Sequence, residues 1–275
     1  MITEITALYS ITDDLLKAIG HSEDCRVQMS DAEVVSAALV AARFFNGNQK
    51  EACEYLKEEG YMPKMLDPSR FCRRLHRLFL PLLDLFDYLG MILKSMNETA
   101  EYLLDSFPVA VCDNIRIGQC QLVHGEDYRG YIASKKRYFY GIRVHLLSTK
   151  EGIPVEFTFL PGEANDTRGL KALPLNLPEG SSIYTDAGYT DYLVEDNMKE
   201  ADNLNLQVMR KRNSKRQDAP WVAYLKQVTR HYIETVFSAI TCRFPKNIHA
   251  VTMDGFLLKI TMFIMVFTLE MAFIS

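Results

Sequence analysis

The sequence lacks several patterns that would assign it to a specialised class of protein. Its 6 cysteines form no CxxC pair, which excludes a zinc ribbon. Its first residues contain no basic stretch followed by a long apolar run, the pattern of a secretory signal. These absences predict a reduced, cytoplasmic protein.

The sequence also lacks an excess of positive charge. It has 31 Lys and Arg residues against 35 Asp and Glu residues, which gives a net charge of −4. Proteins that bind nucleic acid through their overall field are basic, so the total charge gives no support for such binding. Any anionic partner must therefore bind to local basic clusters.

No apolar segment of the sequence is long enough for a typical membrane span. The most apolar stretch runs from Phe256 to Leu269 and contains Lys259. It is shorter than the roughly 20 residues that a spanning helix requires. We therefore expect a buried helix near the C-terminus and no membrane partner.

The first part of the chain has the spacing of amphipathic helices. With 275 residues, of which 48% are hydrophobic, the chain can bury a sizeable core. Up to Met96, apolar residues recur at intervals of three and four. Ser30 and Glu33 form a predicted capping box for a helix from Asp31 to Phe45. The sequence thus predicts an all-helical region, residues 1–96.

After Met96 the spacing becomes that of strands alternating with helices. The predicted strands are residues 102–111, 138–147, 153–160, 182–186 and 206–210, and the predicted helices are 165–175, 190–201 and 220–241. The first three strands are consecutive, whereas the fourth and fifth alternate with helices. This order predicts a mixed sheet with helices on both faces, as in the ribonuclease-H-like fold, over residues 97–275.

Three acids occupy the positions where a ribonuclease-H-like core holds its carboxylates. Asp105 lies in the first strand, Asp186 at the end of the fourth, and Glu234 on the last long helix. Three carboxylates can bind one or two divalent cations and leave room for a substrate phosphate. Each acid alone is also compatible with a turn or a solvated helix position. Their joint placement favours a catalytic and metal-binding triad.

Several neighbouring residues have alternative interpretations. Asp113 competes with Asp105 for the first position, but it lies outside the apolar strand. Asp166 is expected to cap a helix. His231 and Arg230 are expected to lie near phosphate or behind the metal ligands, or simply on the surface.

Three dense basic clusters could bind DNA phosphates despite the acidic total. They contain Arg70, Arg73, Arg74 and Arg77; Lys135, Lys136 and Arg137 with Arg143; and Arg210, Lys211, Arg212, Lys215 and Arg216. The first cluster could instead be an ion-paired helix face, and the third a solvated loop. The long connection from Cys112 to Lys136 is expected to shape a DNA channel.

Aromatic residues in the last third of the chain are expected to pack in the core. They are Trp221, Phe237, Phe244, Phe256 and Phe263.

The sequence resembles the DDE transposases of bacterial insertion sequences, and specifically the family numbered nine-eight-two. The resemblance covers most of the chain, from about Met29 to Ile264. It rests on Met29-Ser-Asp-Ala-Glu33, Ser69-Arg-Phe-Cys-Arg-Arg-Leu-His76, Asp105-Ser-Phe-Pro-Val109, Cys112-Asp-Asn-Ile-Arg116, Arg129-Gly-Tyr-Ile-Ala-Ser-Lys135, Tyr138-Phe-Tyr-Gly141, Asp186-Ala-Gly-Tyr189, Asn213-Ser-Lys-Arg216, Ile233-Glu-Thr-Val-Phe237 and His249-Ala-Val-Thr252.

The resemblance implies an enzyme that acts on DNA with Mg²⁺ or Mn²⁺, with about two ions per active site. Such an enzyme binds the terminal inverted repeats of its element, cuts at the ends and joins a freed 3′-hydroxyl to target DNA. By the same resemblance, Asp105, Asp186 and Glu234 match the acidic triad. A homodimer on double-stranded DNA and a location in the bacterial cytoplasm, with the nucleoid, are also implied.

The sequence departs from these relatives at two positions. Ala187 stands where relatives often carry Lys, and Gln227 stands where related transposases carry Tyr. The missing lysine weakens a phosphate contact without removing an acid. Two other functions remain open, namely a nuclease of the same fold that does not join strands and a catalytically inactive DNA-binding derivative.

Overall fold

The computed structural model describes residues 1–245 and 247–274. The chain divides into two compact units. The first unit contains Met1–Leu89 and Arg243–Ser275, and the second contains Gly90–Cys242. The C-terminal segment thus groups with the N-terminal helices, whereas the sequence analysis assigned it to residues 97–275.

The first unit is helical within the described residues. Its helices are α1 (Ile2–Ala18), α2 (Asp31–Phe44), α3 (Gln49–Glu58), α4 (Pro68–Arg77), the first part of α5 (Phe79–Met96), α9 (Met253–Leu269) and the π-helical turn η5 (Glu270–Ile274). The predicted capping box is present, because the Ser30 hydroxyl accepts from the Glu33 backbone N–H at 3.1 Å and the Glu33 carboxylate accepts from the Ser30 N–H at 2.6 Å. The N-terminal region is therefore helical, as the sequence predicts.

Helix α9 explains why the C-terminal segment groups with the first unit. It contacts α2 and α4, and its residues are buried along most of its length. With η5 it forms a helix, Met253–Ile274, that is long and apolar enough to cross a membrane, but 67% of its most apolar window is buried. The helix is longer than the apolar stretch predicted, and its burial is what we expect of a core helix.

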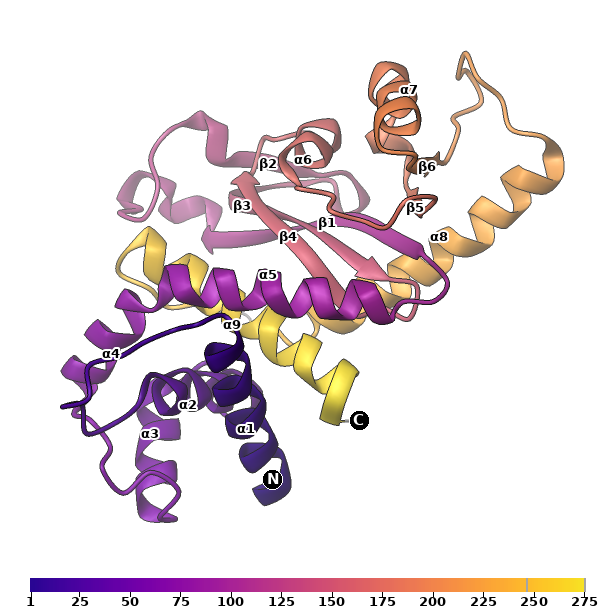
Figure 1. The fold of residues 1–275 in the computed structure, drawn as a ribbon. Helices are drawn as coiled ribbons and strands as arrows, with labels where there is room; N and C mark the ends of the chain where they lie inside the picture. The colour runs from indigo at the N-terminus through magenta and orange to yellow at the C-terminus, as the bar shows by residue number, and fades with distance from the viewer. Residues whose placement is uncertain (246, 275) are drawn as a thin grey trace. The chain divides into compact units, whose positions relative to one another are not determined.

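The second unit is built on a mixed sheet (Figure 1). The described residues contain six strands, namely β1 (Glu101–Cys112), β2 (Arg129–Ile132), β3 (Arg137–Thr149), β4 (Pro154–Pro161), β5 (Ser182–Thr185) and β6 (Asn205–Val208). Their order is β2-β3-β1-β5-β6, and β4 also pairs with β3. The β1–β3 and β3–β4 pairs are antiparallel, whereas β1–β5 and β5–β6 are parallel. The five predicted strands are confirmed.

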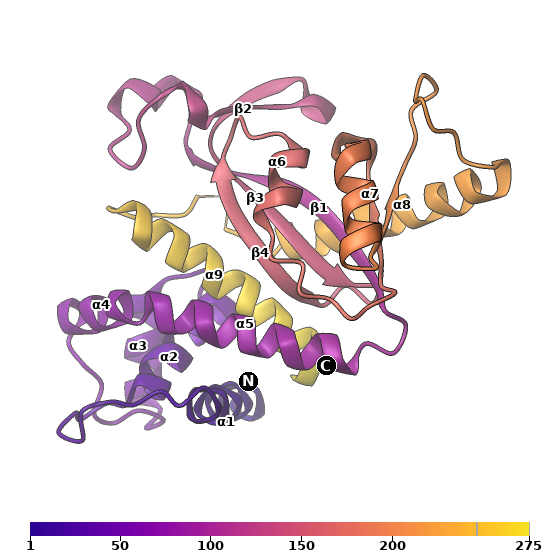
Figure 2. The ribbon, with the colours of Figure 1, turned by 45° about the horizontal axis from the view of Figure 1, so that its top comes forward.

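Helices cover both faces of this sheet (Figure 2). They are α6 (Asp166–Ala172), α7 (Tyr192–Ala201) and α8 (Pro220–Thr241). Neighbouring residues of β1 identify the faces, because side chains alternate along a strand. The Ser106 hydroxyl donates to Asp166 of α6, whereas the Phe107 ring contacts Phe237 of α8 at a centroid distance of 6.4 Å. The arrangement is consistent with the predicted ribonuclease-H-like fold.

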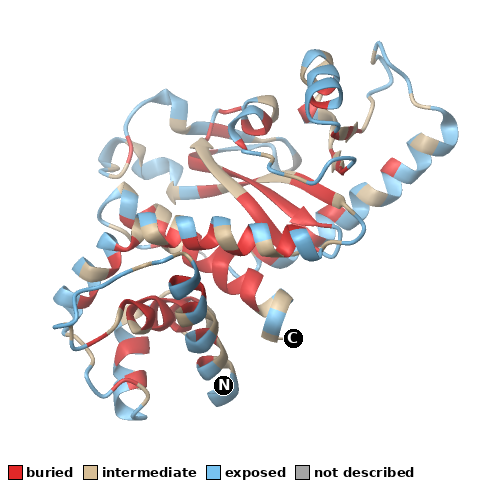
Figure 3. Ribbon diagram, in the orientation of Figure 1, coloured by how far each residue is buried: buried red, intermediate tan, exposed pale blue. Residues whose placement is uncertain are grey.

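Burial follows this arrangement (Figure 3). Buried residues concentrate along β1, β3 and β4, where sheet and helices meet, while the N-terminal half of α8 is mostly exposed. Trp221 lies in that half and is 67% exposed, so its predicted place in the core is wrong. Phe237, Phe256 and Phe263 are buried as predicted, and Phe244 is half-buried.

The connection between β1 and β3 is more ordered than a simple loop. It contains the short helices η1 (Asn114–Gln119), η2 (Glu126–Tyr128) and η3 (Ala133–Lys135). It also contributes β2, an edge strand that pairs with the first part of β3. The sequence analysis missed β2 because it is only four residues long and has no alternating apolar pattern.

Candidate active site

The sheet brings Asp105 and Asp186 to adjacent positions. Strands β1 and β5 run parallel, and Leu104 of β1 pairs with Thr185 of β5. Asp105 and Asp186 are the next residues on the two strands. Two acids that are 81 positions apart in the sequence thus each come directly after one residue of the same cross-strand pair.

Asp105 is held in an environment that disfavours its charge. Burial raises the pKa of its carboxyl to about 7, and the nearby charges of Asp186 and Asp166 contribute to the rise. The Ser106 backbone N–H donates to its Oδ1 at 2.7 Å, and this hydrogen bond lowers the pKa. The positive charge of Arg143 also lowers it, but both effects are smaller than that of burial. At neutral pH this carboxyl is close to half-protonated when no cation is bound.

Asp186 is fixed by the turn that follows β5. Its Oδ1 accepts from the Gly188 backbone N–H at 2.8 Å, at the start of the short helix η4 (Ala187–Tyr189). Burial raises its pKa, and the charge of Asp166 raises it further. The positive charges of Arg230 and Lys211 lower it. Asp186 therefore lies near one acidic group, Asp166 of α6, and two basic groups, Arg230 of α8 and Lys211 of the loop after β6.

Asp166 joins these two acids, although the sequence analysis assigned it to helix capping. The cap of α6 is Asn165, whose side chain accepts from the Arg168 N–H at 2.9 Å. Asp166 instead accepts from the Ser106 hydroxyl at 2.9 Å. Its other oxygen faces Gly188, where a Cβ atom would lie 2.3 Å from Asp166 Oδ2 and 3.0 Å from Asp186 Oδ1. A side chain at position 188 would therefore displace the carboxylate of Asp166.

A buried polar pair lies beneath the acids. Tyr189 and His145 are fully buried, and the Tyr189 hydroxyl lies 3.2 Å from His145 Nδ1. Burial lowers the pKa of His145 to about 4, so the imidazole is neutral at physiological pH. The pKa of Tyr189 is raised, chiefly by burial and then by the charges of the three aspartates. The floor of the site is thus neutral and rigid.

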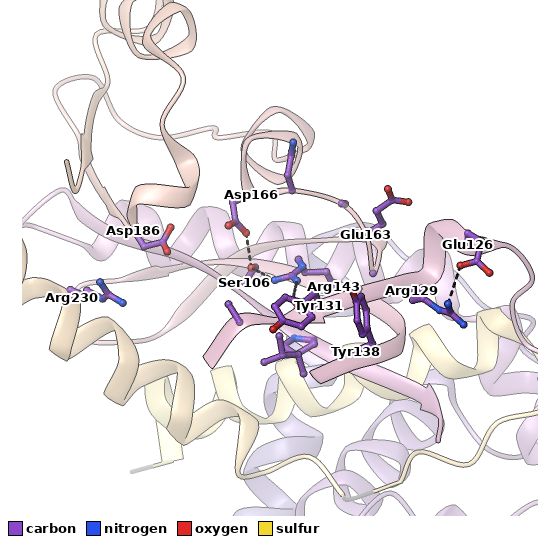
Figure 4. A pocket seen from close by; sticks show the side chains of 17 residues that line it. Ser106, Glu126, Arg129, Tyr131, Tyr138, Arg143, Glu163, Asp166, Asp186 and Arg230 are labelled. Carbon is purple, nitrogen blue, oxygen red and sulfur yellow. Dashed lines mark hydrogen bonds and ion pairs between the residues drawn. The ribbon is translucent and has the colours of Figure 1, made fainter. Parts of the chain in front are cut away.

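Glu234 lies on the same side of the sheet but does not join the other acids. One turn further along α8, Phe237 contacts Phe107, which shares its face of β1 with Asp105. The Glu234 carboxylate is 56% exposed and accepts from Arg230 Nε at 3.0 Å. The charge of Arg230 also acts on Asp186, and the two side chains lie near each other in Figure 4, so this arginine is close to both Glu234 and Asp186.

The donor set fits a divalent cation in part. Asp105 within β1 and Asp186 just after β5 offer carboxylate oxygens at adjacent positions, and hard divalent cations prefer such ligands. No complete group of three or more His, Cys, Asp or Glu side chains is assembled as a metal site in residues 1–245 and 247–274. Two other residues with possible metal ligands lie apart from these acids. Asp113 is exposed after β1, and His231 is exposed on α8.

The basic cluster between β6 and α8 is divided into paired and unpaired residues. Arg210 forms a bidentate ion pair with the buried Glu195 at 2.6 and 2.7 Å, and Arg216 forms one with Asp196 at 2.7 Å. Both arginines also lie over the Tyr192 ring. The three other cations are exposed and form no ion pair within the described residues; they are Lys211, Arg212 and Lys215.

Buried Lys226 closes the base of this loop. Its Nζ donates to the Val208 carbonyl at the end of β6 at 3.1 Å and to both oxygens of Asp218, at 2.9 and 3.0 Å. The lysine belongs to α8, so one ammonium group joins the strand, the loop and the helix that carries Glu234. A buried ammonium is stable only with such complete pairing.

The arginine cluster of α4 is also partly neutralised within the first unit. Arg74 forms ion pairs with Glu23 at 2.9 Å and Asp31 at 2.7 Å, and its side chain is only 19% exposed. Arg70 pairs with Asp67 at 3.2 Å. Arg73 and Arg77 are exposed without an ion pair among the described residues. Arg74 therefore has a structural role, as the alternative of an ion-paired helix face predicts for this residue.

In the cluster at the start of β3, three cations are exposed, whereas Arg143 is half-buried. Lys135, Lys136 and Arg137 form no ion pair in the described part of the chain. Lys136 adopts a left-handed conformation with φ of 47°, which turns the chain from η3 into β3. These cations are free to bind an anionic partner.

A cavity of about 810 Å³ opens over Asp166 and Asp186, while Asp105 and Glu234 are not among the residues that line it (Figure 4). Its lining includes Asp166, Asp186, Arg230, Arg143, Tyr131 and Tyr138. Asp186 and Asp166 thus face the same open space as two arginines and two tyrosines. Such a site can hold an anionic, planar substrate group next to a cation.

Comparison with known proteins agrees with this arrangement. The family model described as "Transposase DDE domain" matches residues 95–250. The matched segment contains Asp105, Asp186, Glu234 and the whole sheet. No curated protein and no solved structure gives a significant match.

Proposed function

The chain belongs to the transposase DDE domain family, and from this premise we propose that it cuts the ends of an insertion sequence and joins them to target DNA. The reaction is divalent-metal-dependent phosphoryl transfer, in which water attacks first and the freed 3′-hydroxyl attacks later. Membership in the particular insertion-sequence family nine-eight-two is part of the proposal and rests on the sequence motifs.

The placement of Asp105 and Asp186 on adjacent parallel strands is the observation that carries this proposal. Their carboxylates come together only through the fold, and the charge of Asp186 raises the pKa of Asp105. Uncompensated carboxylates are costly in a half-buried site. A protein retains such an arrangement when a cation binds there.

The roles of the side chains follow from their positions. When bound, Mg²⁺ or Mn²⁺ neutralises charge that develops on phosphate oxygens. Asp105 and Asp186 would hold the ion, with Glu234 as the third ligand once its ion pair with Arg230 opens. Arg230 lies against Asp186 and is then free to bind a DNA phosphate. The buried Tyr189 and His145 keep the floor of the site rigid.

DNA binding would depend on cations that have no acidic partner. In the second unit these are Lys211, Arg212, Lys215, Lys135, Lys136 and Arg137, and in the first unit they are Arg73 and Arg77. Helix α4 begins at Asp67 with a well-formed cap and presents these two arginines to solvent. We assign α4 to recognition of the terminal inverted repeats, and assembly on DNA to a homodimer in the bacterial cytoplasm.

Cleavage of a labelled duplex carrying the DNA that flanks the coding sequence tests the proposal. In the presence of Mg²⁺ or Mn²⁺, the wild type should cut at the repeat ends, and Asp186→Asn should abolish cutting while retaining DNA affinity. Asp113→Asn is the matched control, because Asp113 is an exposed aspartate outside the acid group. Undiminished cleavage by Asp186→Asn would remove the assignment.

Two other results would redirect the proposal. Cutting without joining would indicate a nuclease of the same fold. Specific binding without cutting, in the wild type as well as the variant, would indicate an inactive transposase derivative.

A further inference from the structure

Two tyrosines form an exposed aromatic pair on the edge of the sheet. Tyr131 of β2 and Tyr138 of β3 are direct partners in the antiparallel ladder. Their ring centroids are 5.0 Å apart at an interplanar angle of 56°. The residues are 47% and 58% exposed, and neither hydroxyl forms a hydrogen bond within the described residues. Their ring faces are therefore available to a ligand.

The tyrosine pair lines the same cavity as the acids. The cavity of about 810 Å³ includes Tyr131 and Tyr138 together with Asp166 and Asp186 (Figure 4). Pockets of about 300 to 1,000 Å³ hold ligands of the size of a nucleotide. The other residues around the tyrosines give the cavity an apolar wall, because Pro108, Ile132 and Ala133 also line it.

Arg143 connects the tyrosine pair to the acids. Its Nη1 donates to the Ser106 hydroxyl at 3.3 Å and its Nη2 donates to the Tyr131 carbonyl at 3.4 Å. Both contacts are long, and the buried Nε has no partner within the described residues. The guanidinium therefore retains capacity to bind a phosphate oxygen between the aromatic pair and Asp105.

We propose that the Tyr131–Tyr138 pair binds one unpaired base of the DNA end being cut, while Arg143 binds the adjoining phosphate. Aromatic rings bind unpaired bases by stacking, which tolerates every base because each has a π face. Stacking on a tyrosine ring requires a base face that no neighbouring base pair covers, so the nucleotide must leave the duplex stack. The site thus favours DNA whose end is opened beside the scissile bond. This inference rests on the proposed function and adds the form of the substrate.

Binding measured in EDTA, where no strand is cut, tests the inference. Fluorescence anisotropy would compare duplexes of the flanking DNA with a paired, a mismatched or an abasic nucleotide at the cleaved end. The wild type should bind the mismatched end about tenfold more tightly than the paired or the abasic end. Tyr131→Ala and Tyr138→Ala should remove this preference.

Control variants separate stacking from folding. Tyr131→Phe keeps the ring and should keep the preference. Tyr224→Ala removes an equally exposed tyrosine of α8 that lies outside the cavity, and it should also keep the preference. Unchanged melting temperatures of both alanine variants of the pair would confirm that their folds are intact.

The inference and the proposed function fail through different results. Equal affinity of the wild type for the three ends would overturn the base site, even if Asp186→Asn abolishes cleavage. A preference for mismatched ends that survives in Tyr131→Ala and Tyr138→Ala would overturn it as well. Full cleavage by Asp186→Asn would overturn the acid assignment and leave the base preference to stand on its own.

Discussion

Asp105 in β1 and Asp186 just after β5 lie in an environment opposite to that of the arginines in the loop before α8. Burial and neighbouring like charges raise the pKa of Asp105 and of Asp186. By contrast, Arg210 and Arg216 have bidentate partners in Glu195 and Asp196. These two carboxylates lie near each other without enough positive charge to neutralise them, whereas each of the two arginines is neutralised by its own acidic partner.

This difference separates residues that hold the structure together from residues that bind ligands. A charge with a complete set of partners contributes to stability, and its removal leaves the partner buried and uncompensated. A charge without partners weakens the free protein and is stabilised when an ion or a phosphate arrives. The density of charge in the sequence does not distinguish the two.

The largest effect should come from breaking the Arg210–Glu195 pair. Arg210→Ala leaves the buried Glu195 carboxylate with only a distant contact from Arg216, at 3.8 Å. We expect a loss of about 4 kcal/mol in the free energy of unfolding, measured with urea. Arg212→Ala is the control and should change it by less than about 0.5 kcal/mol, because Arg212 is exposed and unpaired within the described residues. Similar stability of the two variants would contradict the comparison.

A smaller and opposite effect should follow from Asp105→Asn in the metal-free protein. The folded-state pKa is raised to about 7, so the contribution of Asp105 to stability is full below the unfolded-state pKa and is lost as the pH rises through about 7. The full shift corresponds to about 4 kcal/mol, and screening by solvent at this half-buried position reduces it, so the variant should be more stable than the wild type at pH 8 by about 2 kcal/mol and similar to it at pH 4. Urea titrations at both pH values measure this. Destabilisation at pH 8 would show that the carboxylate is well compensated.

Cation binding should reduce that difference. Mg²⁺ at tenfold over its Kd should stabilise the wild type by about 1.4 kcal/mol, and Asp105→Asn should lose the effect. Because Asp105 must release its proton, the apparent Mg²⁺ affinity should rise as the pH increases through about 7. Thermal melts with and without Mg²⁺ at pH 6 and 8 measure both quantities. Asp113→Asn should behave like the wild type.

The smallest effect concerns DNA affinity. Replacing Lys211, Arg212 or Lys215 with Ala should each lower the salt slope of DNA binding by about one, since each removes a phosphate contact. Arg216→Ala should change the slope less, because Asp196 already neutralises this arginine. Anisotropy titrations over a range of salt concentrations would show equal slopes for Arg212→Ala and Arg216→Ala if the comparison is wrong.

The order of strands and the convergence of Asp105 with Asp186 could be predicted from sequence. Both depend on local apolar patterns and on the parallel pairing that a strand, helix, strand succession imposes. The same patterns predicted α8 with its observed bounds, Pro220–Thr241.

Other features depend on contacts between distant segments and were missed for that reason. Asp166 follows Asn165, and either residue can cap a helix, so nothing local shows which one turns toward Ser106. The pairing of Arg74 with Glu23 and Asp31 spans 43 or more positions. Trp221 follows the helical pattern of a buried residue, but the sheet ends before it reaches that part of α8.

The attachment of Lys226 gives the loop between β6 and α8 a mechanical property. Its ammonium holds Val208 and Asp218 together, so the intervening cations sit on a closed ring rather than a free tether. In the proposed complex, a DNA strand bound to these cations would pull on α8 about two turns before Glu234. Substrate binding and the position of Glu234 would then be mechanically coupled.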